Sequence, residues 1–128
     1  MQKKILIIDD DIDLVEAMRL TLENEDFIVI DAQDGQKGIE KINREKPDLV
    51  LLDVMMETQD EGFHIAYQIR SNEETADLPI IMLTAVSQET GFSFDKEKDE
   101  DFLPVNEFLE KPVNPDTLIE LVKRNLGQ

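Results

Sequence analysis

Short runs of large apolar residues that end in a polar or charged side chain dominate this sequence. Residues 49–52 lead directly into Asp53, and residues 5–8 lead into Asp9 and Asp10. Uninterrupted apolar runs of this length, rich in branched residues, are typical of strands buried on both faces of a parallel sheet. The chain therefore favours a fold in which a central sheet is covered on both sides.

Three further strands complete the predicted sheet. Residues 27–30 and residues 79–84 repeat the apolar pattern, and the second of these runs ends in the hydroxyl of Thr84. Its proline stands at the first position, where a missing amide donor is tolerated. Residues 107–110 predict a short fifth strand, which is followed directly by Lys111 and Pro112.

The segments between these strands have helical spacing. Apolar residues recur at offsets of three and four in residues 12–24, 35–46, 62–70 and 115–126, which predicts four amphipathic helices. The predicted first residues or caps are Asp11, Asp34 with Gly35, and Asn114 with Pro115, and Pro47 stops the second helix. The predicted inner faces consist of Val15, Met18, Leu22, Ile39, Ile42, Phe63, Ala66, Ile69, Leu118, Ile119, Val122 and Leu126.

Two stretches lack any such pattern. Residues 54–61 predict a loop, and residues 85–106 predict a long excursion that holds at most a short helix, because glycine, proline and a charged run interrupt it. We expect its apolar side chains, Phe92, Phe94, Phe102 and Leu103, to replace part of the missing helix packing.

Strands that alternate with helices indicate a doubly wound α/β fold with right-handed crossovers. The 128 residues are enough for one domain, which buries about two-thirds of its unfolded surface. Without cysteine, the chain has no disulfide and no thiol nucleophile. We therefore expect a single domain over residues 1–128.

Acidic residues strongly outnumber basic ones. Thirty acidic and 13 basic residues give a formal net charge of −17, which repels nucleic acid and anionic membranes. The sequence shows no N-terminal signal pattern and no apolar run long enough to cross a bilayer. We expect a cytoplasmic protein that neither binds nucleic acid directly nor inserts into a membrane.

Polar residues follow four of the five predicted strands. Because parallel strands share one direction, Asp9, Asp10, Asp53, Thr84 and Lys111 emerge at the same edge of the sheet. Clustered carboxylates must protonate or recruit a cation, and oxygen ligands alone favour Mg²⁺ or Mn²⁺. With a lysine and a hydroxyl beside the metal, the site can hold a phosphoryl group, and one carboxylate can act as nucleophile.

This arrangement resembles the receiver domain of bacterial two-component response regulators. The family pattern is an acidic pair after the first strand, Asp after the third, Ser or Thr after the fourth and Lys-Pro after the fifth, which matches the residues named above. The resemblance covers essentially the whole chain and implies the flavodoxin-like strand order 2-1-3-4-5.

The resemblance also implies roles for these residues. Asp53 is the expected phosphoacceptor, which receives its phosphoryl group from a sensor histidine kinase or a phosphotransfer protein. Asp10 is expected to bind Mg²⁺ directly and Asp9 mainly through water, while Asp53 and the backbone carbonyl of Met55 complete the protein ligands. Such a domain catalyses its own phosphorylation and is not expected to be an enzyme with a separate substrate.

The remaining implied roles concern the switch. Lys111 is expected to pair with the phosphoryl oxygens, and Thr84 is expected to move inward and donate a hydrogen bond to one of them. Phe108 occupies the switch-aromatic position, and a downstream protein target is expected to read the change. The bond between Lys111 and Pro112 is expected to be cis.

The chain departs from the family in two loops. Glu57 stands where proline is usual, and the excursion before the fifth strand is longer than usual and lacks a regular fourth helix. Because no output segment follows Gln128, we expect the protein either to act through partners or to be a piece of a longer chain.

Two other functions stay open at this stage. The three consecutive aspartates at positions 9–11 suit a phosphatase with an aspartate nucleophile, although Thr84 and Ala85 replace the acidic ligands that such an enzyme needs after the fourth strand. A degenerate receiver that binds partners without phosphorylation is the other alternative.

Overall fold

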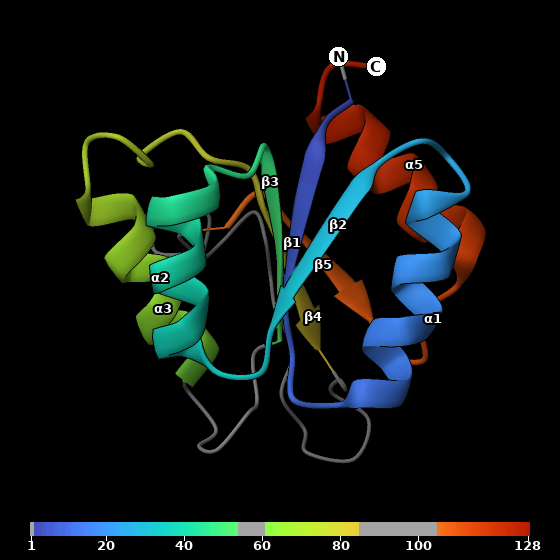
Figure 1. The fold of residues 1–128 in the computed structure, drawn as a ribbon, viewed down its shortest axis with the longest axis horizontal. Helices are drawn as coiled ribbons and strands as arrows, with labels where there is room; N and C mark the ends of the chain where they lie inside the picture. Colours follow the sequence, from blue (N-terminus) through green and yellow to red (C-terminus); the bar gives the residue numbers. More distant parts are fainter. Residues whose placement is uncertain (1, 54–60, 85–104) are drawn as a thin grey trace, which may run out of the picture.

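The computed structural model describes residues 2–53, 61–84 and 105–128, and within these ranges five parallel strands form one sheet (Figure 1). The strand order is β2-β1-β3-β4-β5, which confirms the predicted doubly wound α/β fold and its order. The strands are β1 (Lys4–Ile8), β2 (Ile28–Ala32), β3 (Leu49–Asp53), β4 (Ile80–Thr84) and β5 (Glu107–Glu110), and the described helices are α1 (Ile12–Glu23), α2 (Gly35–Glu45), α3 (Glu61–Ser71) and α5 (Pro115–Asn125).

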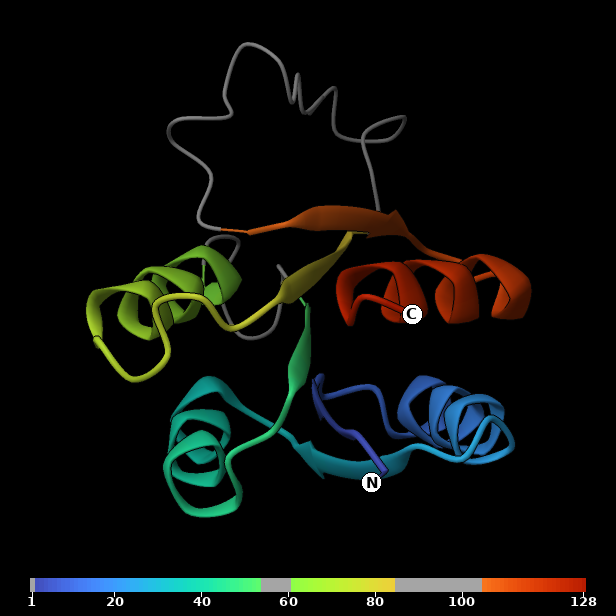
Figure 2. The same ribbon diagram turned by 90° about the horizontal axis from the view of Figure 1, so that it is seen from above.

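Each strand contributes to two separate cores, because successive side chains of a strand point to opposite faces of the sheet. On one face, Ile5 and Ile7 pack with apolar residues of α1 and α5. On the other face, Leu6 and Ile8 pack with residues of α2 and α3. Figure 2 shows these two helical layers on either side of the sheet. The apolar runs show no polar alternation because both of their faces are covered.

Three helices begin at the polar residues that the sequence suggested. Asp11 accepts a hydrogen bond from the backbone of Leu14 (3.2 Å), and Asp34 accepts one from Lys37 (2.8 Å). Asn114 Oδ1 accepts two bonds from the first turn of α5, at 2.9 and 3.2 Å. Each side chain pairs amide donors that a helix start otherwise leaves without a partner.

Strand β2 lies later in the chain than predicted. It begins one residue after the start of the predicted range 27–30 and ends two residues after its end, at Ala32. The carbonyl of Ala32 accepts a bond from the amide of Asp9 (3.1 Å), which holds this extension against the sheet. Asp31 concealed the extension because a carboxylate interrupts an apolar pattern, but here it forms an ion pair with Arg19.

Smaller corrections concern other boundaries. Glu61 was predicted to end a loop, but α3 begins there, and the fourth strand begins after Pro79 rather than at it. In α5 the buried residues include Leu121, which was not predicted to face inward, whereas Ile119 is only half-buried. Helical spacing locates an apolar stripe, but the neighbouring strands decide which residues at its margin become buried.

Some predictions fall outside the described residues. These include the loop and Glu57 within residues 54–60, and the irregular fourth-helix region with its four apolar side chains within residues 85–104. The description resumes at Val105, followed by Asn106, whose Oδ1 accepts bonds from the amide of Ile80 (2.9 Å) and from Arg70 (2.8 Å). None of the described helices combines the length and apolar character needed to cross a bilayer.

Strand β2 is an edge strand, and Arg19 of α1 reaches over its free edge. The backbone groups of Ile28 and Ala32 bond toward β1, so those of Val29 point away from it. Arg19 Nη1 donates a hydrogen bond to the carbonyl of Val29 (2.8 Å), and the guanidinium also pairs with Asp31. The side chain thus occupies an acceptor that no strand pairs with.

Gly38 allows α2 to approach the sheet closely. A Cβ atom at this position would lie 2.4 Å from Ile8 Cδ1 and 2.9 Å from Ile8 Cγ1. Ile8 is fully buried, so its side chain cannot move aside without disturbing the core on this face.

We therefore predict that Gly38→Ala destabilises the protein. Overpacking a core costs about 1–3 kcal/mol, and the better helix propensity of alanine returns about 1 kcal/mol of this. The expected net loss is about 1 kcal/mol in the free energy of unfolding, measured by urea denaturation.

Ile8→Val provides the matched background, because it removes the Cδ1 atom that an added Cβ would contact. In this background Gly38→Ala should cost less than in the parent chain, because only the 2.9 Å contact with Cγ1 remains. An equal cost in both backgrounds would show that close packing against Ile8 is not the reason for glycine here.

Candidate functional site

The side chains predicted from strand ends do meet at one edge of the sheet. Asp9 follows β1, Asp53 is the last residue of β3, Thr84 is the last residue of β4 and Lys111 follows β5. Asp9, Asp53 and Thr84 are 1%, 3% and 5% exposed, although each is polar. Buried polar groups are costly unless they are paired, so their partners define the site.

Asp9 is held in place by its own neighbourhood. Its Oδ1 accepts a hydrogen bond from the backbone amide of Asp11 (2.9 Å), and its backbone amide bonds to β2. Its Oδ2 is buried without a hydrogen-bond partner among the described residues, and Lys111 Nζ lies 3.2 Å from it in an ion pair. This oxygen therefore points into the site with acceptor capacity to spare.

Asp9, Asp10 and Asp53 form an acidic cluster. One carboxylate oxygen from each lies within 4.8 Å of the others, and Asp10 is exposed while the other two are buried. Their mutual repulsion favours a bound cation. Such carboxylate oxygens are the donors that Mg²⁺ or Mn²⁺ prefers, and the open Asp10 side leaves room for the water ligands that Mg²⁺ keeps. The described residues therefore fit a hard divalent cation.

Lys111 partly neutralises this cluster. Its Nζ lies 3.4 Å from Asp53 Oδ1 as well as 3.2 Å from Asp9 Oδ2, and its side chain is 22% exposed. Burial by itself lowers the pKa of Lys111, but the two carboxylates, Asp53 first, outweigh burial and raise the pKa above its ordinary value. The ammonium therefore stays charged at neutral pH, ready to meet a second anion.

Thr84 ends β4, the strand next to that of Asp53, and Phe108 lies on β5, one strand further out. The carbonyl of Thr84 accepts a bond from the amide of Lys111 (2.8 Å), which fixes these two residues to one another. Phe108 pairs in register with Met82, two residues before Thr84, and packs against the core beneath α2 and α3. The Lys111–Pro112 bond is cis, as predicted.

The sequence predicted a metal ligand at Met55 and did not predict the bond between Asp11 and Asp9. Met55, whose backbone carbonyl was predicted to bind the metal, lies outside the described residues. The bond from the Asp11 amide to Asp9 was not foreseen, because Asp11 was predicted only as a helix cap. An aspartate that bonds the amide two residues later is a common turn, so the Asp-x-Asp pattern could have signalled it.

Comparisons with known proteins agree with this geometry. The family model of the response regulator receiver domain matches residues 5–123. The chain is 37% identical over 115 residues to the alkaline phosphatase synthesis transcriptional regulatory protein PhoP of Bacillus subtilis. The aligned region covers 90% of this chain and 45% of PhoP. The chain thus spans less than half the length of that relative.

Two solved structures are similar over nearly their whole length. The chemotaxis protein CheY4 of Vibrio cholerae has a TM-score of 0.84 at 27% identity, with 97% of this chain and 98% of CheY4 covered. A CheY-like receiver domain protein of Methanospirillum hungatei has a TM-score of 0.83 at 27% identity, with 99% and 95% covered. The chain belongs to the response regulator receiver domain family, the signalling modules of two-component systems.

We predict that Lys111→Met lowers the free energy of unfolding by about 1–3 kcal/mol. Removing one partner of a fully buried ion pair costs about 3–5 kcal/mol, and the cost is smaller here because Lys111 keeps some exposure. The substitution leaves Asp9 and Asp53 without their cation. Since the pKa of Lys111 is raised, its stabilisation is complete below the ordinary lysine pKa of about 10.4 and fades only as the pH rises through the raised value. Urea denaturation should therefore give the same loss at pH 7 and pH 9.

Lys123→Met is the matched control. Lys123 forms an ion pair as Lys111 does, but with a single carboxylate, that of Glu25 at 2.8 Å, and its side chain is 40% exposed. A surface pair of this kind contributes at most about 1 kcal/mol. Equal losses in the two variants would contradict a special role of Lys111 in balancing the buried carboxylates.

Proposed function

We propose that Asp53 accepts a phosphoryl group from a phosphohistidine on a sensor histidine kinase or a phosphotransfer protein. The observation that carries this proposal is the geometry around Asp53. Carboxylate oxygens of Asp9, Asp10 and Asp53 lie within 4.8 Å of one another, with Lys111 Nζ 3.4 Å from Asp53. An acidic cluster beside a half-buried ammonium suits a phosphoryl group whose negative charge needs cations on two sides.

Asp53 is better placed as the nucleophile than Asp9. The backbone amide of Asp11 occupies Asp9 Oδ1. Lys111 Nζ lies near both carboxylates, 3.2 Å from Asp9 Oδ2 and 3.4 Å from Asp53 Oδ1, so it does not distinguish them. Asp53 ends a fully buried strand, which holds its backbone rigidly, and its carboxylate lies within the acidic cluster. In the proposed transfer an Asp53 oxygen forms a bond to phosphorus while the bond from phosphorus to the histidine nitrogen breaks. The imidazole leaves with that electron pair.

Mg²⁺ or Mn²⁺, when bound, supplies positive charge that neutralises the oxygens of the transferring group. Asp10 and Asp53 are the proposed direct ligands together with the Met55 carbonyl, and Asp9 is proposed to act mainly through water. Lys111 is already within reach of Asp53, so its ammonium is proposed to pair with a phosphoryl oxygen.

The proposed output is a shift between two conformations. The Thr84 hydroxyl donates a hydrogen bond to the phosphoryl group, and Phe108 turns inward as Thr84 moves. Because Thr84 and Lys111 are joined through their backbones, a change at one strand end reaches β5 directly. A downstream protein that binds one conformation better than the other then reads the phosphorylation state.

Phosphorylation can be tested without a kinase. Incubation with acetyl phosphate and Mg²⁺ should add one phosphoryl group to the intact mass, and Asp53→Ala should abolish it. Addition that persists in Asp53→Ala would contradict the proposal. Steady turnover of p-nitrophenyl phosphate that Asp9→Asn abolishes would instead favour the aspartate-nucleophile phosphatase.

A separate prediction concerns the cation. Asp10→Asn should weaken Mg²⁺ binding, measured by calorimetry, by about tenfold or more, since even the loss of an outer partner of a metal ligand costs 10–100-fold. Asp13→Asn is the matched control, because Asp13 is an exposed carboxylate in the first turn of α1 and outside the cluster. Equal affinities in both variants would exclude Asp10 as a ligand.

A further inference from the structure

Helix α2 carries a stripe of basic side chains in a chain whose net charge is −17. Lys37, Lys41 and Arg44 follow one another at spacings of four and three residues, which places them on one face of the helix. The other described helices are neutral or acidic by formal charge, whereas α2 is basic. The stripe is therefore a local reversal of the general charge.

The basic groups of the stripe form few ion pairs with the described residues of the chain. Lys37 and Lys41 form no ion pair with any described residue, and Arg44 has only a 3.7 Å contact with Glu45 while its side chain is 68% exposed. Elsewhere, Lys111 and Lys123 each contact a carboxylate within the chain. Like charges one turn apart, as in Lys37 and Lys41, weaken a helix.

A groove of about 350 Å³ lies between the stripe and the carboxyl end of β2, lined by residues 31–33 and the basic side chains. Figure 2 shows α2 beside β2 at the edge of the sheet. Two carboxylates also line the groove. That of Asp31 is already paired with Arg19, and that of Glu40 forms no ion pair with a described residue. The groove is therefore basic on balance.

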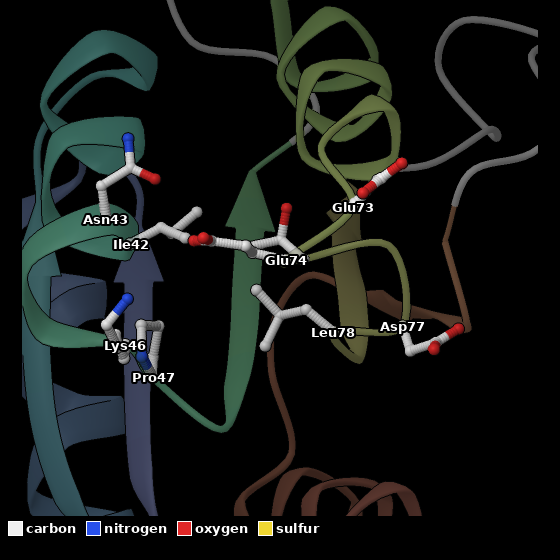
Figure 3. Close-up of a pocket in the computed structure, with 9 residues that line it drawn as sticks. Ile42, Asn43, Lys46, Pro47, Glu73, Glu74, Asp77 and Leu78 are labelled. Carbon is white, nitrogen blue, oxygen red and sulfur yellow. The ribbon is translucent and has the colours of Figure 1, made fainter.

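The cleft on the opposite side of α2 is acidic on balance. A cleft of about 270 Å³ separates the end of α2 from the loop after α3 (Figure 3), and Glu73, Glu74 and Asp77 line it with Lys46. An anionic segment is repelled from this cleft and attracted to the groove. At physiological salt, charges beyond about 8 Å are largely screened, so the nearest groups decide where such a segment settles.

We propose that the groove between α2 and β2 binds an acidic segment of a partner protein, whose carboxylates pair with Lys37, Lys41 and Arg44. A short peptide fits better than nucleic acid, because a long polyanion would extend over the acidic remainder of the surface. This surface lies outside the phosphoacceptor cluster, and its binding does not require phosphorylation of Asp53.

The test uses a hexa-aspartate peptide as probe and nuclear magnetic resonance of the whole ¹⁵N-labelled chain. Amide signals of residues 33–45 should shift on titration, more weakly as the salt rises from 50 to 200 mM. The variant Lys37→Gln/Lys41→Gln/Arg44→Gln should bind at least tenfold more weakly, and its amide spectrum reports directly whether it is folded. If it does not fold, the single variants Lys37→Gln and Lys41→Gln, each expected to lose about two- to fourfold, take its place.

Lys3→Gln is the matched control for Lys37→Gln, because both residues are exposed lysines and both changes remove one charge. It should leave the affinity within twofold of the unsubstituted chain. The proposal is overturned if no signal of residues 33–45 shifts at millimolar peptide, if the glutamine variants bind as well as the parent, or if Lys3→Gln weakens binding equally. It is also overturned if single-stranded DNA of six phosphates binds to this groove as tightly as the peptide.

Discussion

The ammonium of Lys111 lies between two buried carboxylates, those of Asp9 and Asp53, and the site depends on this arrangement. Two anions in a poorly hydrated edge repel each other strongly, and taking either from water is costly. A cation at 3.2–3.4 Å from both offsets part of this cost. Apart from its ion pair with Lys111, Asp9 Oδ2 has no hydrogen-bond partner within residues 2–53, 61–84 and 105–128, and Asp10 stays exposed, so the edge retains capacity for further charge.

The parallel sheet brings these residues, which are distant in the sequence, to one edge of a small domain. Asp9 and Lys111 are far apart in sequence, yet each follows a strand that runs in the same direction, and β3 and β4 fill the space between them. The apolar stems of these strands are fully buried on both faces, so the backbone that carries the site has little freedom. Rigid placement on strand ends suits chemistry that depends on charges a few ångströms apart.

The amino-acid sequence was sufficient to predict the sheet, the helices and which polar residues share an edge, because burial on two faces and a common strand direction are visible as patterns. It was not sufficient where tertiary contacts decide. The charge of Asp31 placed it outside the predicted strand, because its ion pair with Arg19 is visible only in the structure. The helical spacing also did not show that Leu121 rather than Ile119 is buried at the margin of α5. The basic groove also needed the structure, since the spacing of Lys37, Lys41 and Arg44 does not show that this face of α2 lines a groove with residues 31–33.

The contact of Arg19 with the free edge of β2 has a consequence for solubility. An open edge strand exposes acceptors and donors to which another chain can add a strand, which is a common route to aggregation. Arg19 engages the outward carbonyl of Val29 and covers the edge with a positive charge, so a further strand would first have to displace it. Resistance to association in this protein is thus expected from two features, a high net charge at long range and a guanidinium over one outward-facing carbonyl of β2.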